Sequence, residues 1–326
     1  MQQKFIDKKI SSKKIQILLC GSGRWAQNLY KEISKNFHNK SKIFFYTKNK
    51  KNLLLWLTKN KYSNFELLEK IPEAKKKFNY AIVVNKNKDH FKMTVSLLKK
   101  NYNVLVEKPL ICSEAQINYL NKLSEVKKKI IIISMQFLYS KAFLKIKNKI
   151  KKDKIKILEI SWLDKKKEII KNILKKHDYS IQFIEDVYYH FYSIITLFLK
   201  KNLSLKNSRI LKIDFNKITI DINNIIIKCF FSRDAKKRKR QITILTKLNN
   251  KIIINFNNFK NILIFKNKLK NETMQNFTLK YQIFNFINNN YNEKPLVNDI
   301  RNLSIFFENL KFIKAYEKNI NFNTSI

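Results

Sequence analysis

The sequence predicts an α/β chain of two domains, a parallel sheet with helices followed by an α+β domain on a mostly antiparallel open sheet. The 326 residues exceed the usual size of a single core. The first part alternates apolar strands with amphipathic helices, which is typical of a parallel sheet. The later part is a series of short β-rich segments separated by turn residues. We place the domains at residues 1–138 and 139–326.

The charge balance is strongly basic, with 68 Lys and Arg against 24 Asp and Glu, a net charge of +44. Such a charge would fit a nucleic-acid-binding protein, which stays an alternative of another class. However, only six of the 68 cations are arginines, the residues that specific nucleic-acid readers prefer, and the lysines are spread along the chain. Together with the scarcity of glycine, this indicates an AT-rich codon bias and no specific nucleic-acid partner. The basic run Lys236–Arg240 is interpreted as a solvated hairpin connection.

Cysteine usage and apolar runs bear on the compartment. Cys20, Cys112 and Cys229 are widely spaced and lack metal-ligand spacing, which indicates a reducing compartment and no metal site. The first 14 residues contain no apolar leader, and no later run reaches the ~18 uncharged apolar residues of a membrane span. We therefore expect a cytoplasmic protein that does not bind membranes.

Glycine is nearly absent, yet the two glycines of the chain, Gly21 and Gly23, are one residue apart. They follow the apolar strand Ile15–Cys20 and precede a helical stripe with apolar residues at Ala26, Leu29, Tyr30, Ile33 and Phe37. A merely structural turn could use Asn, as the chain does at 223–224 and 249–250.

The order strand, GxGxxA and helix is the context of a dinucleotide-binding fingerprint on a Rossmann fold. Gly21 allows the turn, Gly23 lets the backbone approach the pyrophosphate, and Ala26 lets the helix pack on the strand. The phosphates would lie at the helix N-terminus, beside Arg24 and Trp25.

The second strand, Ile43–Tyr46, ends near the expected adenosine ribose. An NAD enzyme usually places an acidic residue there, but this chain has Thr47 and Lys48. A hydroxyl and a cation suit the 2′-phosphate of NADP. The cofactor is thus expected to be NADP(H) or NAD(H), with a preference for NADP(H).

A second motif begins with the strand near Tyr80 and continues through Asn85, His90 and a helix ending at Asn101 to Glu107-Lys108-Pro109. This order and spacing resemble the Gfo/Idh/MocA family, named after glucose-fructose oxidoreductase and inositol dehydrogenase. Asn101 stands for the usual glycine and is suited to a left-handed helix C-cap. The resemblance implies that Asn85, His90, Glu107 and Lys108 lie on the cofactor side, and that Lys108 also contacts the substrate.

The rest of the chain continues the resemblance. Ser113 and Gln116 form a capping box, followed by the strand Ile130–Ser134. The expected C-terminal strands are Ile155–Trp162, Arg209–Phe215, Ile225–Phe231, Gln241–Thr246, Lys251–Phe256 and Asn261–Phe265. Asp299–Glu317 would be the closing helix, with Pro295 just before it. The second Glu-Lys-Pro, at 293–295, is assigned no chemistry, and His38 and His177 carry no argument.

Hydride transfer from a carbinol needs a base and a group that stabilises the alkoxide. Lys108 follows a parallel strand, where open α/β sheets bind ligands. Asp186 and His190 resemble the family's DxxxHxxD helix and share one helical face. We expect His190 to be the base and Asp186 to orient its ring or contact the substrate. Ser193 replaces the second aspartate of the motif, which leaves the substrate class open.

The leading hypothesis is an NAD(P)-dependent oxidoreductase that acts on a sugar, sugar nucleotide or related hydroxy or keto compound. An imine reductase of the same fold, similar to thiazolinyl imine reductases of natural-product biosynthesis, and a non-catalytic dinucleotide-binding relative stay open. The family resemblance also implies a homo-dimer or homo-tetramer that associates through the outer face of the C-terminal sheet.

Overall fold

The computed structural model describes residues 15–37, 41–75, 78–150, 154–167, 169–170, 173–174, 179–199, 208–214, 216–258, 261–267, 269–275, 278–288 and 298–323. The chain forms two compact units, residues 1–135 with 279–303 and residues 136–278 with 304–326. A segment near the C-terminus thus returns to the N-terminal unit, which the sequence did not predict. His38, His177 and the second Glu-Lys-Pro lie outside the described residues.

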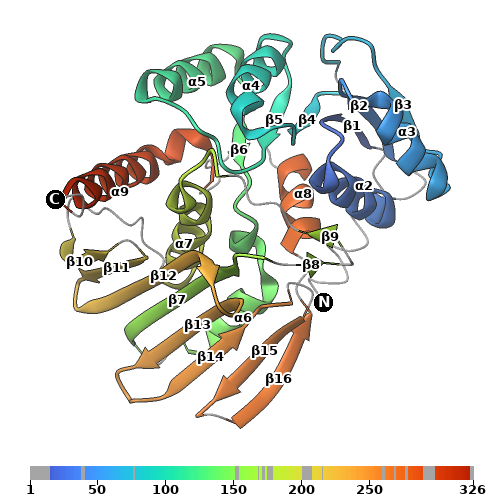
Figure 1. Ribbon diagram of the computed structural model, residues 1–326. Helices are drawn as coiled ribbons and strands as arrows, with labels where there is room; N and C mark the ends of the chain where they lie inside the picture. Colours follow the sequence, from blue (N-terminus) through green and yellow to red (C-terminus); the bar gives the residue numbers. More distant parts are fainter. Residues whose placement is uncertain are drawn as a thin grey trace. The chain divides into compact units, whose positions relative to one another are not determined.

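The N-terminal unit contains a six-stranded parallel sheet in the order β3-β2-β1-β4-β5-β6 (Figure 1). Its strands are β1 (Ile15–Cys20), β2 (Ser41–Tyr46), β3 (Phe65–Leu67), β4 (Tyr80–Val83), β5 (Asn103–Val106) and β6 (Ile131–Ile133). The chain winds outward from β1 to one edge and from β4 to the other. The strand order therefore reverses between β1 and β4, the place where open α/β sheets bind ligands.

Helices connect these strands. They are α2 (Arg24–Phe37), α3 (Lys50–Lys59), the 3-10 turn η2 (Asn87–Asp89), α4 (His90–Lys99) and α5 (Glu114–Lys127). The five apolar residues of the predicted stripe are the buried residues of α2. They belong to a core that also includes Ile283, Phe286 and Ile287 of α8 (Thr278–Asn288). The Tyr80 hydroxyl donates to the Ile287 carbonyl at 2.8 Å, so the returning helix completes this core.

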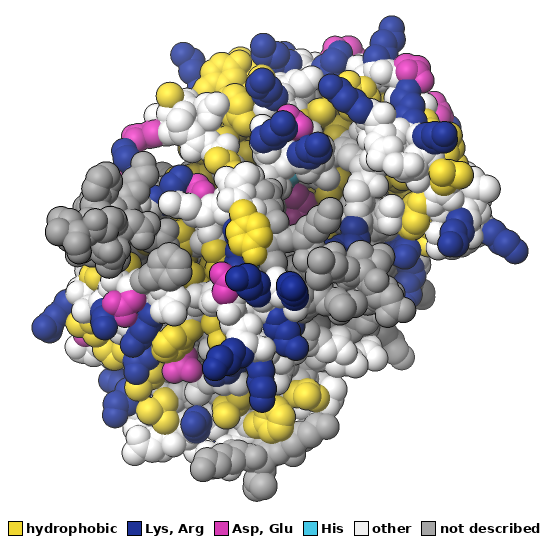
Figure 2. Space-filling model, in the orientation of Figure 1, with side chains coloured by type: hydrophobic (Ala, Val, Ile, Leu, Met, Phe, Trp, Pro, Cys, Tyr) yellow, Lys and Arg dark blue, Asp and Glu magenta, His cyan; other side chains and the backbone are white. Residues whose placement is uncertain are grey.

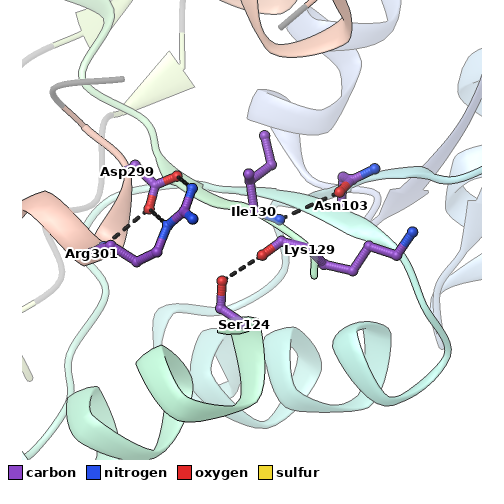
Figure 3. Close-up of polar contacts among 6 residues, drawn as sticks. All are labelled: Asn103, Ser124, Lys129, Ile130, Asp299 and Arg301. Atoms are coloured by element: carbon purple, nitrogen blue, oxygen red, sulfur yellow. Dashed lines mark hydrogen bonds and ion pairs between the residues drawn. The ribbon is translucent and has the colours of Figure 1, made fainter. Parts of the chain in front are cut away.

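The other returning segment extends the edge of the sheet. Asn298 pairs with Ile133 through two hydrogen bonds, from the Ile133 N–H to the Asn298 carbonyl and from the Asn298 side chain to the Ile133 carbonyl. The Asp299 carboxylate is buried and accepts a bidentate ion pair from Arg301 (Figure 3). Asp299 also caps the 3-10 turn η4 (Ile300–Asn302), so the closing helix α9 (Ser304–Asn323) begins later than predicted.

The C-terminal unit contains an eight-stranded sheet in the order β10-β11-β12-β7-β13-β14-β15-β16 (Figure 1). All neighbours are antiparallel except β12 and β7. The strands are β7 (Ile155–Lys165), β10 (Arg209–Asp214), β11 (Lys217–Ile222), β12 (Ile225–Ala235), β13 (Lys239–Thr246), β14 (Lys251–Asn255), β15 (Asn261–Lys266) and β16 (Leu269–Gln275). The short strands β8 (Ile169–Ile170) and β9 (Ile173–Leu174) form a separate pair.

One face of this sheet is covered by α7 (Phe183–Leu199), with the turn η3 (Gln136–Tyr139) and α6 (Lys141–Lys149) beside it. Alternate residues of the central strands point to this face and are buried, as in Leu158, Ile160 and Trp162 of β7. Nearly all side chains of α7 are buried, because α9 packs on it as well.

The predicted fold class is confirmed. The interpretation of Lys236–Arg240 as a hairpin connection is wrong, because β12 and β13 lie on opposite sides of β7 and do not pair. Only residues 236–238 connect the strands, and Arg240 is buried within β13. The prediction also missed β3, β11 and β16.

Among the described residues, Asn and Lys occupy every position of positive φ except that of Gly21. Asn101 has a φ of 62°, which confirms the predicted helix C-cap, and the turns with Asn223, Asn224 and Asn249 also have positive φ. The predicted capping box of Ser113 and Gln116 is present. Within the described parts of the chain, none of the helices is both long and apolar enough to span a membrane.

The end of α5 yields a prediction about stability. Lys128 caps this helix with φ 50° and ψ 44°, and Ser124 ties the turn together by donating to the Lys129 carbonyl (Figure 3). A Cβ in this conformation is strained, so Lys128→Gly should stabilise the protein by about 1 kcal/mol. Lys122→Gly, at an exposed position inside the same helix, should destabilise it by about 1 kcal/mol. Urea unfolding of both variants would measure this, and equal losses would contradict the assigned cap.

Candidate dinucleotide-binding site

The turn after β1 brings three strand ends together. The Gly21 N–H donates to the Tyr46 carbonyl at 3.0 Å, and the Val84 N–H donates to the Cys20 carbonyl at 2.9 Å. Gly21 has a φ of 141°, and a Cβ built there would lie 2.7 Å from the Val84 carbonyl oxygen. Only glycine permits this approach of the β1 and β4 ends.

Gly23 has no such internal reason. A Cβ built at Gly23 would meet no atom within 4 Å, and its φ is not in the left-handed region. Neither packing within the described protein nor backbone strain requires glycine there. Its carbonyl accepts the first hydrogen bond of α2, from Gln27 at 3.0 Å, so the space above it lies at a helix N-terminus. This is space that a bound phosphate can occupy, with free backbone N–H groups to receive it.

The side chains around this space suit an anion. Gly23 and Arg24 are exposed, and Trp25 is partly buried. Ala26 is fully buried against the sheet, as the fingerprint requires of its third small residue. The predicted pyrophosphate-binding residues are therefore brought together at one edge of the sheet.

The end of β2 lies beside the same turn. The Ser22 and Thr47 hydroxyl oxygens are 2.9 Å apart, and the Asn49 N–H donates to the Thr47 hydroxyl at 3.1 Å. Lys48 is exposed. The next acidic side chains after the turn in sequence, Glu66 and Glu69, form ion pairs with Lys42 and Lys50. The turn at residues 47–49 thus presents hydroxyl and cationic groups.

His90 holds two loops of this edge together. Its ring is almost fully buried, with Nδ1 3.0 Å from the Pro109 carbonyl oxygen and Nε2 3.2 Å from the Asn85 carbonyl oxygen. Carbonyl oxygens only accept, so a neutral ring donates to one of them at a time. Burial lowers the pKa of His90, while these carbonyls act in the opposite direction. The ring therefore links the loop after β4 to the residue after Lys108.

The carboxyl group of Glu107 lies buried under this loop. It accepts from the Ser134 hydroxyl at 2.7 Å and from the Lys108 N–H at 3.3 Å. Burial raises the pKa of Glu107, and the hydrogen bond from Ser134 together with the charge of Lys108 partly opposes this. Glu107 thus orders the backbone at Lys108. The Lys108 side chain is partly exposed just beyond the end of β5.

Asn85 offers a possible contact for a ligand. Its side-chain Oδ1 is buried and has no hydrogen-bond partner among the described residues. An orphaned acceptor in such a place is costly unless a bound molecule satisfies it. Asn85 directly follows the Val84 carbonyl that contacts Gly21, so this acceptor belongs to the same edge of the sheet.

The other predicted residues, Asp186 and His190, lie in the C-terminal unit, one helical turn apart on α7. His190 is 5 % exposed, and its ring stacks on the Trp162 indole with centroids 4.1 Å apart and planes 20° apart. Asp186 is partly exposed. Lys108 lies in the other, N-terminal unit.

Ser193 shows what replaced the motif's second aspartate. It is fully buried, and its hydroxyl donates to the His190 carbonyl of its own helix at 2.9 Å. The third position of the motif therefore presents no charged group.

The sequence did not reveal the surroundings of His190. Arg240 of β13 stacks on the same indole, 3.9 Å from its centroid, and forms a buried ion pair with Asp164. The only signal in the sequence is the rarity of arginine, which makes Arg240 an exception among the cations. Among the described residues no group of three or more His, Cys, Asp or Glu could hold a metal ion.

Comparisons with known proteins agree with this geometry. Residues 15–135 match the model of the Gfo/Idh/MocA family, an oxidoreductase family with an NAD-binding Rossmann fold. Among proteins with curated descriptions, none matches the sequence.

Several solved structures share the fold of the whole chain. A dehydrogenase from Clostridium difficile is 18 % identical over 93 % of this chain and 100 % of its own, with a TM-score of 0.66. The UDP-N-acetylglucosamine 3-dehydrogenase of Acidithiobacillus ferrooxidans is 13 % identical over 91 % and 96 %, with a TM-score of 0.68. A 3-ketoreductase from Actinomadura kijaniata, solved with NADP, is 10 % identical over 88 % and 93 %, with a TM-score of 0.65.

The two glycines give a matched pair of variants. Gly21→Ala should destabilise the protein by about 2–4 kcal/mol, because its methyl group overlaps the Val84 carbonyl in a strained conformation. Gly23→Ala should change stability by less than about 1 kcal/mol but weaken dinucleotide binding at least about tenfold. Urea unfolding and fluorescence titration would separate the two effects. Tight binding by Gly23→Ala would contradict the pyrophosphate site.

Proposed function

We infer the function from one premise: through residues 15–135 this chain belongs to the Gfo/Idh/MocA family of oxidoreductases, with their NAD-binding Rossmann fold. We propose that it transfers a hydride between a nicotinamide cofactor and a carbon that alternates between hydroxyl and keto forms. The cofactor, when bound, supplies or accepts the hydride.

The observation that carries this proposal is the open space at Gly23. A chain that uses Asn at its left-handed turns retains glycine where neither packing nor backbone strain requires it. A ligand that comes close to the backbone explains the exception, and a phosphate at the N-terminus of α2 is the ligand that this position favours. Asn85, with its orphaned acceptor, would contact the cofactor's donor groups at the same edge.

We propose NADP(H) as the preferred cofactor. In this proposal the exposed Lys48 ammonium and the Thr47 hydroxyl receive the 2′-phosphate, because the turn at 47–49 lacks the carboxylate that an NAD enzyme places on the ribose. Lys50 is engaged with Glu69 and is not assigned this role.

The residue roles follow from what each side chain can do. Lys108, held by the ordered backbone at Glu107, would donate a hydrogen bond to the substrate oxygen and stabilise its negative charge. His190 would exchange a proton with the substrate, since imidazole titrates near neutral pH. Asp186, one turn before it, would contact the substrate or orient the ring.

For the substrate, we propose a sugar or sugar nucleotide. Two of the structural neighbours are a UDP-N-acetylglucosamine 3-dehydrogenase and a 3-ketoreductase, and the first of these names a sugar nucleotide. An imine reductase is the second candidate. Ser193 favours it, because its hydroxyl is used within α7 and a sugar polyol would lose the contact of the missing carboxylate.

We also propose a compartment, a class of partner and an oligomeric state for this protein. All three cysteines are free thiols, which suits a reducing compartment such as the cytoplasm. Lys and Arg side chains are spread over the face shown in Figure 2, with uncharged and hydrophobic groups between them, which favours a small-molecule partner over nucleic acid. We propose a homo-dimer or homo-tetramer through the outer face of the C-terminal sheet, where Ile157, Leu245 and Ile253 are only partly buried.

Cofactor preference can be tested with Lys48→Glu. The change places a carboxylate where the 2′-phosphate is expected, so NADPH affinity should fall about tenfold or more while NADH affinity is kept or improved. Lys59→Glu, exposed at the end of α3, is the control for net charge. Fluorescence titration gives both dissociation constants. An unchanged ratio of the two would rule out Lys48 as a selectivity residue.

Turnover tests the function itself. NADPH consumption at 340 nm should appear with a ketosugar nucleotide, a simple ketose or a cyclic imine, and the productive class decides between the two candidates. Lys108→Met and His190→Gln should each lower kcat by about 10²-fold or more while NADPH still binds. Cofactor binding without turnover of any class would favour a non-catalytic relative. Salt-sensitive binding of nucleic acid without cofactor binding would overturn the assignment.

A further inference from the structure

Three side chains from three elements form a continuous stack in the C-terminal unit. Arg240 of β13 lies directly opposite Trp162 of β7, and His190 reaches the same indole from α7. The guanidinium carbon is 3.9 Å from the indole centroid, and the imidazole centroid is 4.1 Å from it. Two groups this close to one centroid cannot share a face of the ring. Trp162 therefore lies between Arg240 and His190.

Both ends of the stack are held. Arg240 is 2 % exposed and forms an ion pair with Asp164, which is 4 % exposed and two residues beyond Trp162 on the same face of β7. The backbone N–H of Arg240 also donates to the Asn257 side-chain oxygen at 2.7 Å. At the other end, Phe137 of η3 meets the His190 ring edge-on with centroids 5.3 Å apart. The plane of the imidazole is thus set by aromatic contacts on both sides.

Stability does not explain the ion pair. A buried pair of opposite charges seldom stabilises a protein more than apolar side chains of the same volume, because both charges lose their hydration. The neighbouring inward positions of β13, Ile242 and Ile244, are apolar and fully buried. The composition also indicates a specific role for Arg240, because almost every cation of this chain is lysine. A planar guanidinium that stacks on an indole and pairs with a carboxylate cannot be replaced by an ammonium.

We propose that Arg240 and Asp164 are positioning residues for His190, acting through Trp162. The ion pair fixes the guanidinium on one face of the indole, and the indole fixes the imidazole on the other. A cation on the far face also makes a second cation on the near face less favourable, so the stack favours the neutral ring that can accept a proton. The role of His190 as a base rests on the proposed function. The effect of the stack on the orientation and charge of the His190 ring does not depend on that function.

Some charged groups on the described elements around His190 favour protonation of its ring, and others oppose it. Arg240 on β13 opposes protonation, while Asp164 on β7 and Asp186 on α7 favour it. Phe137 on η3 and Trp162 on β7 carry no charge. Removing the cation alone and removing the anion alone must therefore shift the His190 titration in opposite directions.

The test is NMR titration of the histidine ring signals in the full chain, with His190 assigned by His190→Gln. Arg240→Gln should raise the midpoint of the His190 titration by about one pH unit, and Asp164→Asn should lower it. Arg240→Lys keeps the charge but loses the planar guanidinium, so it should move the midpoint less than Arg240→Gln does while reducing the ring-current shift of the His190 protons. Arg233→Gln is the matched control: it removes a cation that contacts α7 through Phe183 and not through Trp162, and it should leave the midpoint unchanged.

A second variant covers the case in which a single charge left in the core prevents folding. Arg240→Met with Asp164→Leu removes both charges and should fold. In this variant the upfield ring-current shift of the His190 protons, caused by stacking on Trp162, should be reduced. Midpoints that do not move in the single variants, or an unchanged ring-current shift in the double variant, would overturn the proposal. NADPH binding, measured in parallel, reports on the proposed function independently.

Discussion

The close approach of Gly21 to the end of β4 is the constraint on which the cofactor edge of the N-terminal unit depends. Because no side chain separates the two backbones, β1 ends against the Val84 carbonyl and its chain turns at once into α2. The same turn bonds to Tyr46, so the end of β2 is fixed as well. Ser22 and Thr47 then meet on one side and Asn85 lies on the other. Fixing three strand ends within one turn makes a rigid edge out of short loops.

The sequence predicted several features of the N-terminal unit well because their signals are local. The apolar stripe of α2, the capping box at Ser113 and the left-handed Asn101 each depend on residues within a few positions of one another. Asp186 and His190 were likewise found on one helix. The prediction failed where the cause lies far away in the chain. Arg240 appeared to belong to a solvated basic run, because its partner Asp164 is 76 residues earlier. The edge strand β16 carries the polar sequence LKNETMQ, which shows no apolar alternation.

The amino-acid composition is most informative where a scarce residue type is present. In a chain that has only two glycines and six arginines, Gly21, Gly23 and Arg240 are exceptions that call for a physical reason. Gly21 meets a requirement of the fold. At Gly23, packing within the described residues does not require glycine. Arg240 is buried in a core where an apolar side chain would lose less hydration free energy. Glycine and arginine, both scarce in this chain, thus mark two places where chemistry is proposed.

The return of α8 to the N-terminal unit has a consequence for how the protein is made. Three side chains of α8 belong to the same core as helix α2, namely Ile283, Phe286 and Ile287. The Tyr80 hydroxyl also donates a hydrogen bond to the Ile287 carbonyl. During synthesis, the first 135 residues leave the ribosome well before these three side chains exist. The N-terminal unit must therefore wait, with part of its core uncovered, until translation has passed residue 287. By that point most of the C-terminal unit has already emerged, so the unit that starts first is completed late.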